Sequence, residues 1–173
     1  MKIVIIGYPG SGKSTLAKRL SSIYNCKYLH MDKISFYPNW VEKETSLRIN
    51  SLKEFLKENP SSWVIDGNYF KILFEERVEL ADKIIYLNFN RFTCYFSALK
   101  RAIVYKHKER ESAPEGCKEN FSLSFQWWIL HQSRTSKRKK TFNELKEKYP
   151  NKFIELKNRK EVNKFIDGIT NKK

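Results

Sequence analysis

Short apolar runs recur along the chain and alternate with longer stretches of mixed character. Five of these runs are typical of buried strands: residues 2–6, 26–30, 62–65, 83–89 and 152–156. The stretch 44–58 looks helical, with its apolar residues on one side, and we expect two further helices over about 70–80 and 159–167. Strands that alternate with helices predict a parallel sheet covered on both faces. The chain has no internal repeat and no low-complexity linker, so we expect a single domain over residues 1–173.

A strongly patterned helix is predicted to begin at Arg91. Its apolar residues recur at spacings of four, three and four: Phe92, Phe96, Leu99 and Ile103. This spacing places them on one side of the helix, and we expect that side to face the core. Residues 107–120 then break the pattern with Pro114, Gly116 and many charges, and a helical region in one or two pieces follows over 121–148.

The residues after the first predicted strand fit a phosphate-binding pattern. Gly7 to Thr15 read GYPGSGKST, which matches G-x-x-x-x-G-K-[ST], and a helix-forming stretch follows. Glycines let successive backbone N–H groups point at phosphate oxygens, and the helix N-terminus adds partial positive charge. Lys13 is expected to reach the β- and γ-phosphates, and the Ser14 hydroxyl to ligate Mg²⁺. The predicted triphosphate-binding residues are Gly10, Ser11, Gly12, Lys13, Ser14 and Thr15.

Polar residues follow the second and third predicted strands, at the edge where parallel sheets bind ligands. Asp66 is a candidate Mg²⁺ ligand or acceptor-orienting group; an Asp-Gly pair is also common in turns, but residue type and position favour function. Asp32 is a candidate to accept the proton of an acceptor hydroxyl, or a strand-end aspartate. His30 either faces the ligand or is a structural strand-end side chain. Five more residues line an acceptor pocket or belong to the core: Phe36, Tyr37, Trp40, Asn68 and Tyr69.

Basic residues are concentrated near and after the irregular segment. Phosphoryl transfer spreads negative charge over oxygens that arginines stabilise, so Arg101, Arg134 and Arg138 are candidate catalytic residues. Arg134 and Arg138 are four residues apart and are expected to share a helix face. Together with the irregular segment, these arginines predict a lid insertion over residues 107–140. The neighbouring lysines are better explained as a solvated basic face.

Charge and cysteine content narrow the class of protein. Residues 91–173 carry 21 Lys and Arg against 9 Asp and Glu, and so hold +12 of the net charge of +15. This excess favours polyanionic partners, either nucleotides or nucleic acid. The three cysteines have neither disulfide-framework nor metal-ligand spacing, which indicates a reducing compartment. No signal peptide is recognisable and no apolar run could span a bilayer, so we expect a cytoplasmic protein without a membrane partner.

Four motifs spread over nearly the whole chain carry a resemblance to known proteins. They are Ile6–Thr15, Leu29–Asp32, Trp63–Tyr69, and Glu115–Cys117 before the Trp127-Trp128 pair. With these motifs the chain resembles the adenylate-kinase-like branch of phosphate-loop proteins, and more specifically the bacterial DNA topology modulation proteins. The resemblance implies a three-layer α/β/α fold like that of adenylate and shikimate kinases, with a five-stranded parallel sheet in the order 2-3-1-4-5 and a helical lid. It also implies ATP and Mg²⁺ as cofactors, and a place near the adenine for Lys157–Arg159.

The resemblance also bears on the acceptor. Asp66-Gly67 is similar to an Asp-Gly pair of adenylate kinases, where Phe-Pro-Arg follows and the arginine grips the acceptor phosphate. Here Asn68–Lys71 follow, so that arginine is absent, and this absence argues against a plain nucleotide as the acceptor. The position of Asp32 is similar to that in small-molecule kinases that phosphorylate a hydroxyl.

The function we expect is Mg²⁺-ATP-dependent phosphoryl transfer to a small acceptor. One alternative is a nucleic-acid-associated ATP-binding protein, which the basic second half of the chain favours. The chain nevertheless shows no helix-turn-helix, zinc-finger or single-strand stacking signature. The other alternative is a nucleotide-binding regulator without catalysis.

Overall fold

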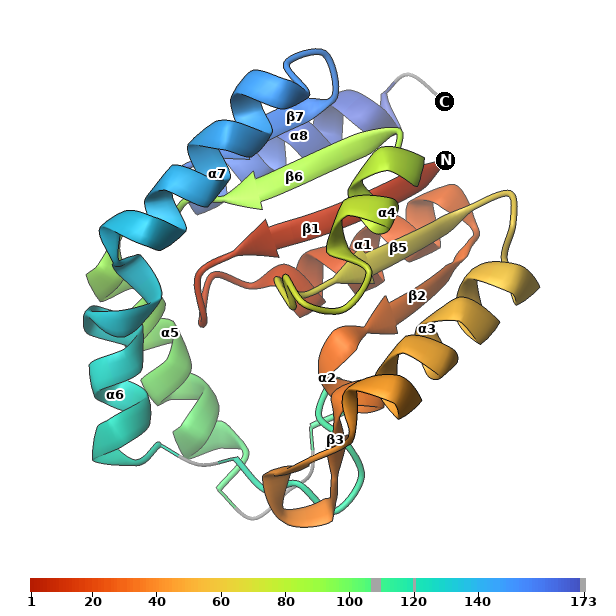
Figure 1. Ribbon diagram of the computed structural model, residues 1–173. Helices are drawn as coiled ribbons and strands as arrows, with labels where there is room; N and C mark the ends of the chain where they lie inside the picture. The colour runs from red at the N-terminus through yellow and green to blue at the C-terminus, as the bar shows by residue number, and fades with distance from the viewer. Residues whose placement is uncertain (107–109, 120, 172–173) are drawn as a thin grey trace.

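The fold is organised around a parallel sheet. The computed structural model describes residues 1–106, 110–119 and 121–171. The five strands lie in the order β2-β5-β1-β6-β7 (Figure 1): β1 (Lys2–Gly7), β2 (Lys27–His30), β5 (Trp63–Asp66), β6 (Lys83–Leu87) and β7 (Phe153–Leu156). Each neighbouring pair is parallel. Counted along the chain, this is the order 2-3-1-4-5, so the expected α/β sheet and its strand order are confirmed.

Helices cover both faces of the sheet, because strands that are apolar on both sides must be buried on both sides. Figure 1 shows α1 (Lys13–Tyr24) and α8 (Arg159–Thr170) behind the sheet, and α4 (Phe74–Leu80) and α7 (Ser136–Lys148) in front of it. Arg19 of α1 donates a hydrogen bond to Asn163 of α8 (3.2 Å) behind the sheet. In front of it, the ring of Tyr86 on β6 stacks on Phe142 of α7, with centroids 4.4 Å apart.

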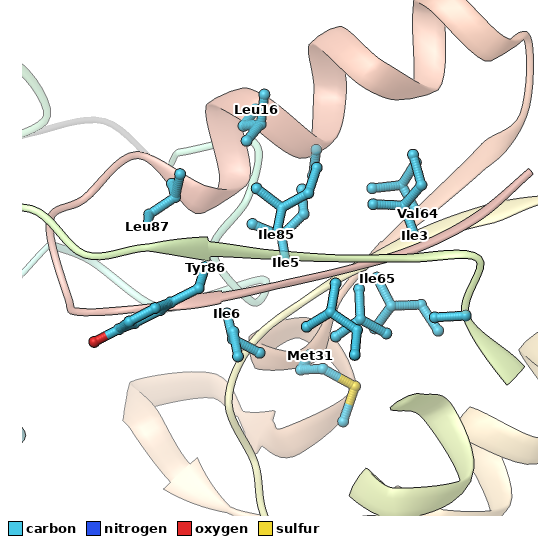
Figure 2. Packing of buried hydrophobic residues seen from close by; sticks show 14 of the residues in the cluster. Ile3, Ile5, Ile6, Leu16, Met31, Val64, Ile65, Ile85, Tyr86 and Leu87 are labelled. Carbon is cyan, nitrogen blue, oxygen red and sulfur yellow. The ribbon is translucent and has the colours of Figure 1, made fainter. Parts of the chain in front are cut away.

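The core consists of branched apolar side chains from the central strands. Figure 2 shows them on both faces of the sheet, with Leu16 of α1 on one side and Met31 on the other. Ile3, Ile5 and Ile6 of β1 have no exposed area. Side chains of this shape fit the pleated surface of a strand, which explains why this stretch forms the middle of the sheet. The result is a rigid platform whose carboxyl edge carries the candidate site.

The chain between β2 and β5 forms more structure than the sequence predicted. A short helix, a hairpin and a longer helix follow β2: α2 (Met31–Ser35), β3 (Phe36–Tyr37), η1 (Pro38–Trp40), β4 (Val41–Glu42) and α3 (Thr45–Glu58). β3 and β4 pair antiparallel. The hairpin turns through Asn39 and Trp40, both at positive φ (+60° and +61°). Such a turn depends on backbone conformation and not on apolar spacing, so the hydrophobic pattern gives no signal for it.

The prediction for the buried face of α5 (Arg91–Val104) is wrong. Three members of the expected core stripe are 61–67% exposed: Phe92, Phe96 and Ile103. The buried face is formed instead by Cys94 and Ala98. It lies against the phosphate loop, where a Cβ added to Gly10 would stand 2.3 Å from the Cys94 carbonyl oxygen. The buried side of α5 thus carries two small residues, and Phe92, Phe96 and Ile103 are left at the surface.

The helical region predicted over 121–148 forms in two pieces. α6 (Leu123–Leu130) is followed by the turn η2 (Gln132–Arg134) and then by α7. Of the expected lid over 107–140, residues 107–109 and 120 lie outside the described residues. Within the described part of the chain, no helix is both long enough and apolar enough to cross a membrane.

Candidate functional site

The loop between β1 and α1 has a conformation that its glycines make possible. Gly10 (φ +77°) and Gly12 (φ +92°) lie in the left-handed region, where a side chain is disfavoured. At Gly10 a Cβ would also collide with the backbone of Cys94. The loop therefore curls tightly beside α5 and enters α1 with Gly12 as the N-cap.

The curled loop leaves several donors without partners. The first bond of α1 runs from Leu16 N to Gly12 O (3.0 Å). The N–H groups of residues 13–15 therefore precede the helical ladder, and no side chain caps them. The Ser11 Oγ is buried and has no hydrogen-bond partner among the described residues. Because buried polar groups are nearly always paired, these donors fit an anionic ligand such as a phosphate chain.

Lys13 lies in the same concavity. Its Nζ donates to the carbonyl oxygens of Gly7 (3.2 Å) and Tyr8 (3.0 Å). Burial lowers the pKa of the Lys13 ammonium, and the charges of Asp66 and Asp32 oppose that shift. Both carboxylates thus lie near enough to act on Lys13, which connects the phosphate loop with the ends of β2 and β5.

Asp66 and His30 form a buried pair. In the register of β2 and β5, His30 stands opposite Asp66, and its Nδ1 lies 2.8 Å from Asp66 Oδ1. Both side chains are only 5% exposed. The imidazole therefore fixes one carboxylate oxygen of Asp66, and no hydrogen bond to a described residue uses the other. His30 thus orients Asp66, and it also lines the cavity described below, so its position is compatible with both of the roles expected for it.

The turn after β5 is fastened at two points. Asn68 Oδ1 accepts a hydrogen bond from Gly7 N, and Asn68 Nδ2 donates to Gly7 O, each at 3.0 Å. Arg77 of α4 has no exposed area and donates to the carbonyls of Gly67, Asn68 and Tyr69 at 3.2–3.3 Å. Sequence reasoning missed Arg77, because an arginine is rarely buried without a charged partner and nothing local marks it.

Asp32 lies on α2, directly after β2. The Tyr69 hydroxyl donates to Asp32 Oδ1 (2.6 Å). Burial, and next the charge of Asp32, raise the pKa of Tyr69, so the phenol keeps its proton and acts as a donor. The second oxygen of Asp32 has no hydrogen-bond partner among the described residues. Asp32 is thus held in place with one oxygen left to accept a proton.

Two arginines converge on one buried glutamate. Arg101 Nε donates to Glu119 Oε2 (3.0 Å), and Arg110 Nε lies 2.9 Å from Glu119 Oε1, an ion pair without hydrogen-bond alignment. Burial, and next the charge of Arg110, lower the pKa of Arg101, while Glu119 opposes the shift. No hydrogen bond to a described residue uses the terminal Nη groups of either arginine. The pair therefore offers concentrated positive charge, and neither Arg110 nor Glu119 was identified from the sequence.

The prediction that Arg134 and Arg138 share a helix face is wrong, because the two residues lie in different elements. Arg134 lies in η2; its Nη2 donates to Phe89 O (2.8 Å), and its guanidinium lies 3.7 Å from the ring centre of Tyr8. A helix cap intervenes, because the Thr135 hydroxyl accepts from Arg138 N at the start of α7. Arg134 thus supports the phosphate loop, whereas Arg138 lines the cavity described below.

The described part of the irregular segment, residues 110–119, is tied to both sides of the site. Glu111 pairs with Lys18 of α1 (2.6 Å) and accepts a hydrogen bond from the Tyr28 hydroxyl (2.8 Å). On the hairpin side, Trp40 Nε1 donates to the Lys118 carbonyl (2.8 Å). Residues 110–119 therefore bridge α1 and the β3–β4 hairpin.

A single cavity of about 1790 Å³ joins these groups. Its lining includes every predicted site residue except Ser11 and Arg134, and it also includes Phe36, Trp40, Asn68 and Tyr69. Sites for one small ligand typically enclose ~300–1,000 Å³, so this cavity has room for a nucleotide and a second molecule.

The residues present fit Mg²⁺-ATP. In nucleotide sites Mg²⁺ keeps several waters and takes one or two protein oxygens beside the phosphates. The Ser14 hydroxyl and the free oxygen of Asp66 can supply these ligands. Among the described residues, no three His, Cys, Asp or Glu side chains gather into a separate metal site. Arg159, whose Nη2 donates to Ser97 Oγ (2.8 Å), stands beside Gly12, as expected if the nucleotide lies near the start of α8.

Comparison with known proteins finds kinases. No protein-family model matches the chain. The chain is similar to an adenylate kinase of Mesoplasma florum, with 29% identity over 152 residues that cover 69% of this chain and 71% of that enzyme. A solved structure of a gluconokinase from Sinorhizobium meliloti 1021 matches 98% of this chain and 89% of its own, with a TM-score of 0.49 and 12% identity. The resemblance to DNA topology modulation proteins stays an expectation from the sequence motifs.

Proposed function

We propose that this protein is a phosphate-loop kinase that transfers a phosphoryl group from Mg²⁺-ATP to a hydroxyl of a small acceptor. One observation carries the proposal: a single cavity contains the phosphate loop together with Asp32, Asp66 and Arg101. The similarity to an adenylate kinase supports phosphoryl transfer in general. A regulator that only bound a nucleotide would need no oriented carboxylate beyond the phosphate loop, and the regulator hypothesis has less support for that reason.

Each residue of the loop and of the strand ends has one role in this proposal. The N–H groups of residues 13–15 and the Lys13 ammonium hold the β- and γ-phosphates. Ser14 and Asp66 would hold Mg²⁺, which would supply positive charge to the phosphate oxygens. Asp32 accepts the proton of the acceptor hydroxyl as the hydroxyl oxygen attacks the γ-phosphorus, the bond from that phosphorus to the β–γ bridging oxygen breaks, and ADP leaves.

Positive charge on the acceptor side comes from the lid and from α5. Arg101 and Arg138 line the cavity and are proposed to stabilise the charge that develops on the transferred group. Arg77, in the helix after the Asp-Gly pair, does not replace the missing acceptor arginine, because its Nη groups are occupied by backbone carbonyls. We therefore propose a hydroxyl-bearing metabolite as acceptor in preference to a nucleoside monophosphate.

The experiment that tests the proposal is a phosphoryl-transfer screen with nucleoside monophosphates, nucleosides and sugars as acceptors. Product formation should depend on Mg²⁺ and ATP and should be abolished by Lys13→Ala. Lys139→Ala is the matched control, because this lysine is exposed on α7 and outside the cavity. Full activity of the Lys13→Ala variant, or the absence of any product across the screen, would contradict the proposal.

Nucleic-acid binding is the second candidate, favoured by the exposed basic residues of α7. Phosphate-backbone binding weakens steeply as salt is added. A duplex and a single-strand probe titrated at several salt concentrations therefore separate this candidate from the first. Tight binding with a strong salt slope would support it, and its absence would leave phosphoryl transfer as the function.

A further inference from the structure

Two neighbouring helices carry most of the large apolar side chains that the described surface exposes. Six of the eleven such side chains lie on α5 and α6: Phe92, Phe96, Ile103, Val104, Leu123 and Trp127. We call these six residues the α5–α6 face; Val104, at the end of α5, also lines the cavity of the candidate site. Leu123 is 83% exposed and Trp127 is 55% exposed. A concentration of this kind marks a surface that another molecule covers, whereas single exposed apolar residues need no explanation.

The two helices form one unit at the edge of the molecule. The Tyr95 hydroxyl of α5 donates to Gln126 Oε1 of α6 (2.9 Å), and the rings of Tyr95 and Phe121 have centroids 5.4 Å apart. Figure 1 shows α5 and α6 next to each other, away from the sheet. The residues of the α5–α6 face therefore lie on two helices that contact each other.

The spacing of the exposed residues on α5 is that of a helix–helix seam. Phe92, Phe96, Leu99 and Ile103 are four, three and four residues apart, the alternation seen where two helices pack along their length. The residues that flank this stripe are mostly uncharged: Thr93, Tyr95 and Ala102, with Lys100 as the exception. α6 contains no charged residue at all and is apolar on nearly every side, yet only Ile129 is buried. A helix of that composition normally lies inside a protein.

We propose that a second copy of this chain covers the α5–α6 face in a two-fold symmetric dimer. The six side chains together present on the order of 700 Å² of surface, close to the ~800 Å² per partner of a standard interface. Symmetric pairing of one patch with itself is the commonest form of protein assembly. The same residues meet across the axis, and because they carry almost no charge, no like charges are brought together at its centre.

The distribution of charge favours a second copy over an acidic protein or an anionic lipid surface. α6 carries no charge, and the largest local excess lies on α7, with six Lys and Arg against two Glu; α5 carries three basic residues and no acidic one, and α8 has one more basic than acidic residue. Arg101 on α5 is paired with Glu119. Recognition of a polyanion would require basic side chains within the face itself, and only Lys100 and Arg91 lie near it.

The salt dependence of binding distinguishes a second copy of this chain from an anionic partner. Apolar self-association between two positively charged copies should strengthen as salt screens their repulsion, whereas binding to an anionic partner should weaken. Sedimentation velocity of the full chain at roughly 1–100 μM, in about 0.05 and 0.5 M NaCl, measures both the mass and this salt dependence. We expect a dimer whose dissociation constant falls at the higher salt concentration.

Two variants test whether the α5–α6 face forms the dimer interface. Phe96→Glu places a carboxylate four residues before Lys100, which keeps helical support, and Trp127→Gln removes the largest ring. Each should raise the dissociation constant at least tenfold, with the circular dichroism spectrum unchanged. Leu47→Gln is the matched control, because Leu47 is a 43% exposed apolar residue on α3 and should leave the dimer intact.

The proposal is overturned by a monomer at the highest concentration in both salts. It is equally overturned by a dimer that Phe96→Glu and Trp127→Gln leave unchanged, or by a chain that stays monomeric and binds anionic phosphatidylglycerol vesicles in low salt only. None of these measurements depends on phosphoryl transfer, so the dimer and the proposed function can fail separately.

Discussion

Arg77 offers the sharpest test of how the site is held together. It has no exposed area, and its two Nη groups donate to three consecutive carbonyls of the turn after β5, at 3.2–3.3 Å. That turn contains Asn68, which binds the backbone of Gly7 in both directions. Substitution Arg77→Met keeps the length of the side chain and removes the donors. We expect a loss of stability and a looser phosphate loop.

The expected loss of stability is the balance between the lost hydrogen bonds and the relieved cost of burying a charge. A hydrogen bond to a charged group stabilises by about 1.5–3 kcal/mol, and these long bonds belong at the lower end of that range. Burial lowers the pKa of Arg77 to about 10 against the opposing charge of Asp66, and its Nε has no partner among the described residues, so burying this charge is costly. Removing the charge therefore offsets part of the stability that is lost with the hydrogen bonds. The free energy of unfolding should therefore fall by about 2–3 kcal/mol, and the Tm by roughly 4–12 °C.

Urea unfolding of Arg77→Met beside the wild type measures this loss. Lys53→Met, at an exposed position of α3, controls for the change of residue type and should stay within about 0.5 kcal/mol of the wild type. A second measurement is the affinity for ATP, which should weaken several-fold because Asn68 is no longer fixed. If Arg77→Met is as stable as the control variant, the turn does not depend on the guanidinium and the reasoning is refuted.

Three further outcomes are expected. Gly10→Ala should lose ATP binding by isothermal titration, because a Cβ there would stand 2.3 Å from Cys94 O at a φ of +77°; binding at wild-type affinity would show that the loop can open. Asn68→Leu should remove both hydrogen bonds to Gly7, lower the Tm and weaken ATP binding together; a lowered Tm with unchanged affinity would separate the two effects. The hydrogen bond from Asn88 and the ammonium of Lys146 lower the pKa of Glu155, so its stabilisation is present above the unfolded pKa of about 4.3 and is lost as the pH falls through the lower folded value. Glu155→Gln should thus be less stable than the wild type at pH ~7 and indistinguishable from it in acid, as measured by urea midpoints across pH; a difference that persists in acid would contradict this origin.

Much of the site could be predicted from the sequence, because its chemistry lies in contiguous stretches. The phosphate loop is one such stretch, and its glycines, lysine and serine define a conformation and a ligand class together. Asp32 and Asp66 were found by the same route, since each directly follows or ends an apolar strand. Parallel strands bring such ends to one edge, which is a consequence of topology and needs no knowledge of side-chain packing.

The residues that sequence reasoning missed act through partners that are far away in the chain. Arg77 shows no local signal, because its role exists only where α4 passes the turn after β5. Glu119 looks like one acidic residue among many charges until Arg101 and Arg110 are found around it. Arg134 shows the converse, since its place near the candidate arginines suggested catalysis and its contact with Tyr8 gives it a supporting role.

What the sequence determined by itself is the order of strands and helices, the phosphate loop and the carboxylates at the strand ends, since short-range patterns encode all of these. Only the tertiary structure decided which side of α5 is buried. The apolar stripe at Phe92, Phe96 and Ile103 predicts a buried face, but it cannot say whether this chain or another one covers it. The phosphate loop packs on the backbone of Cys94, and the buried residues of α5 are Cys94 and Ala98. The stripe is left on the surface because the helix turns these two small residues, which allow close packing, toward the rest of the molecule.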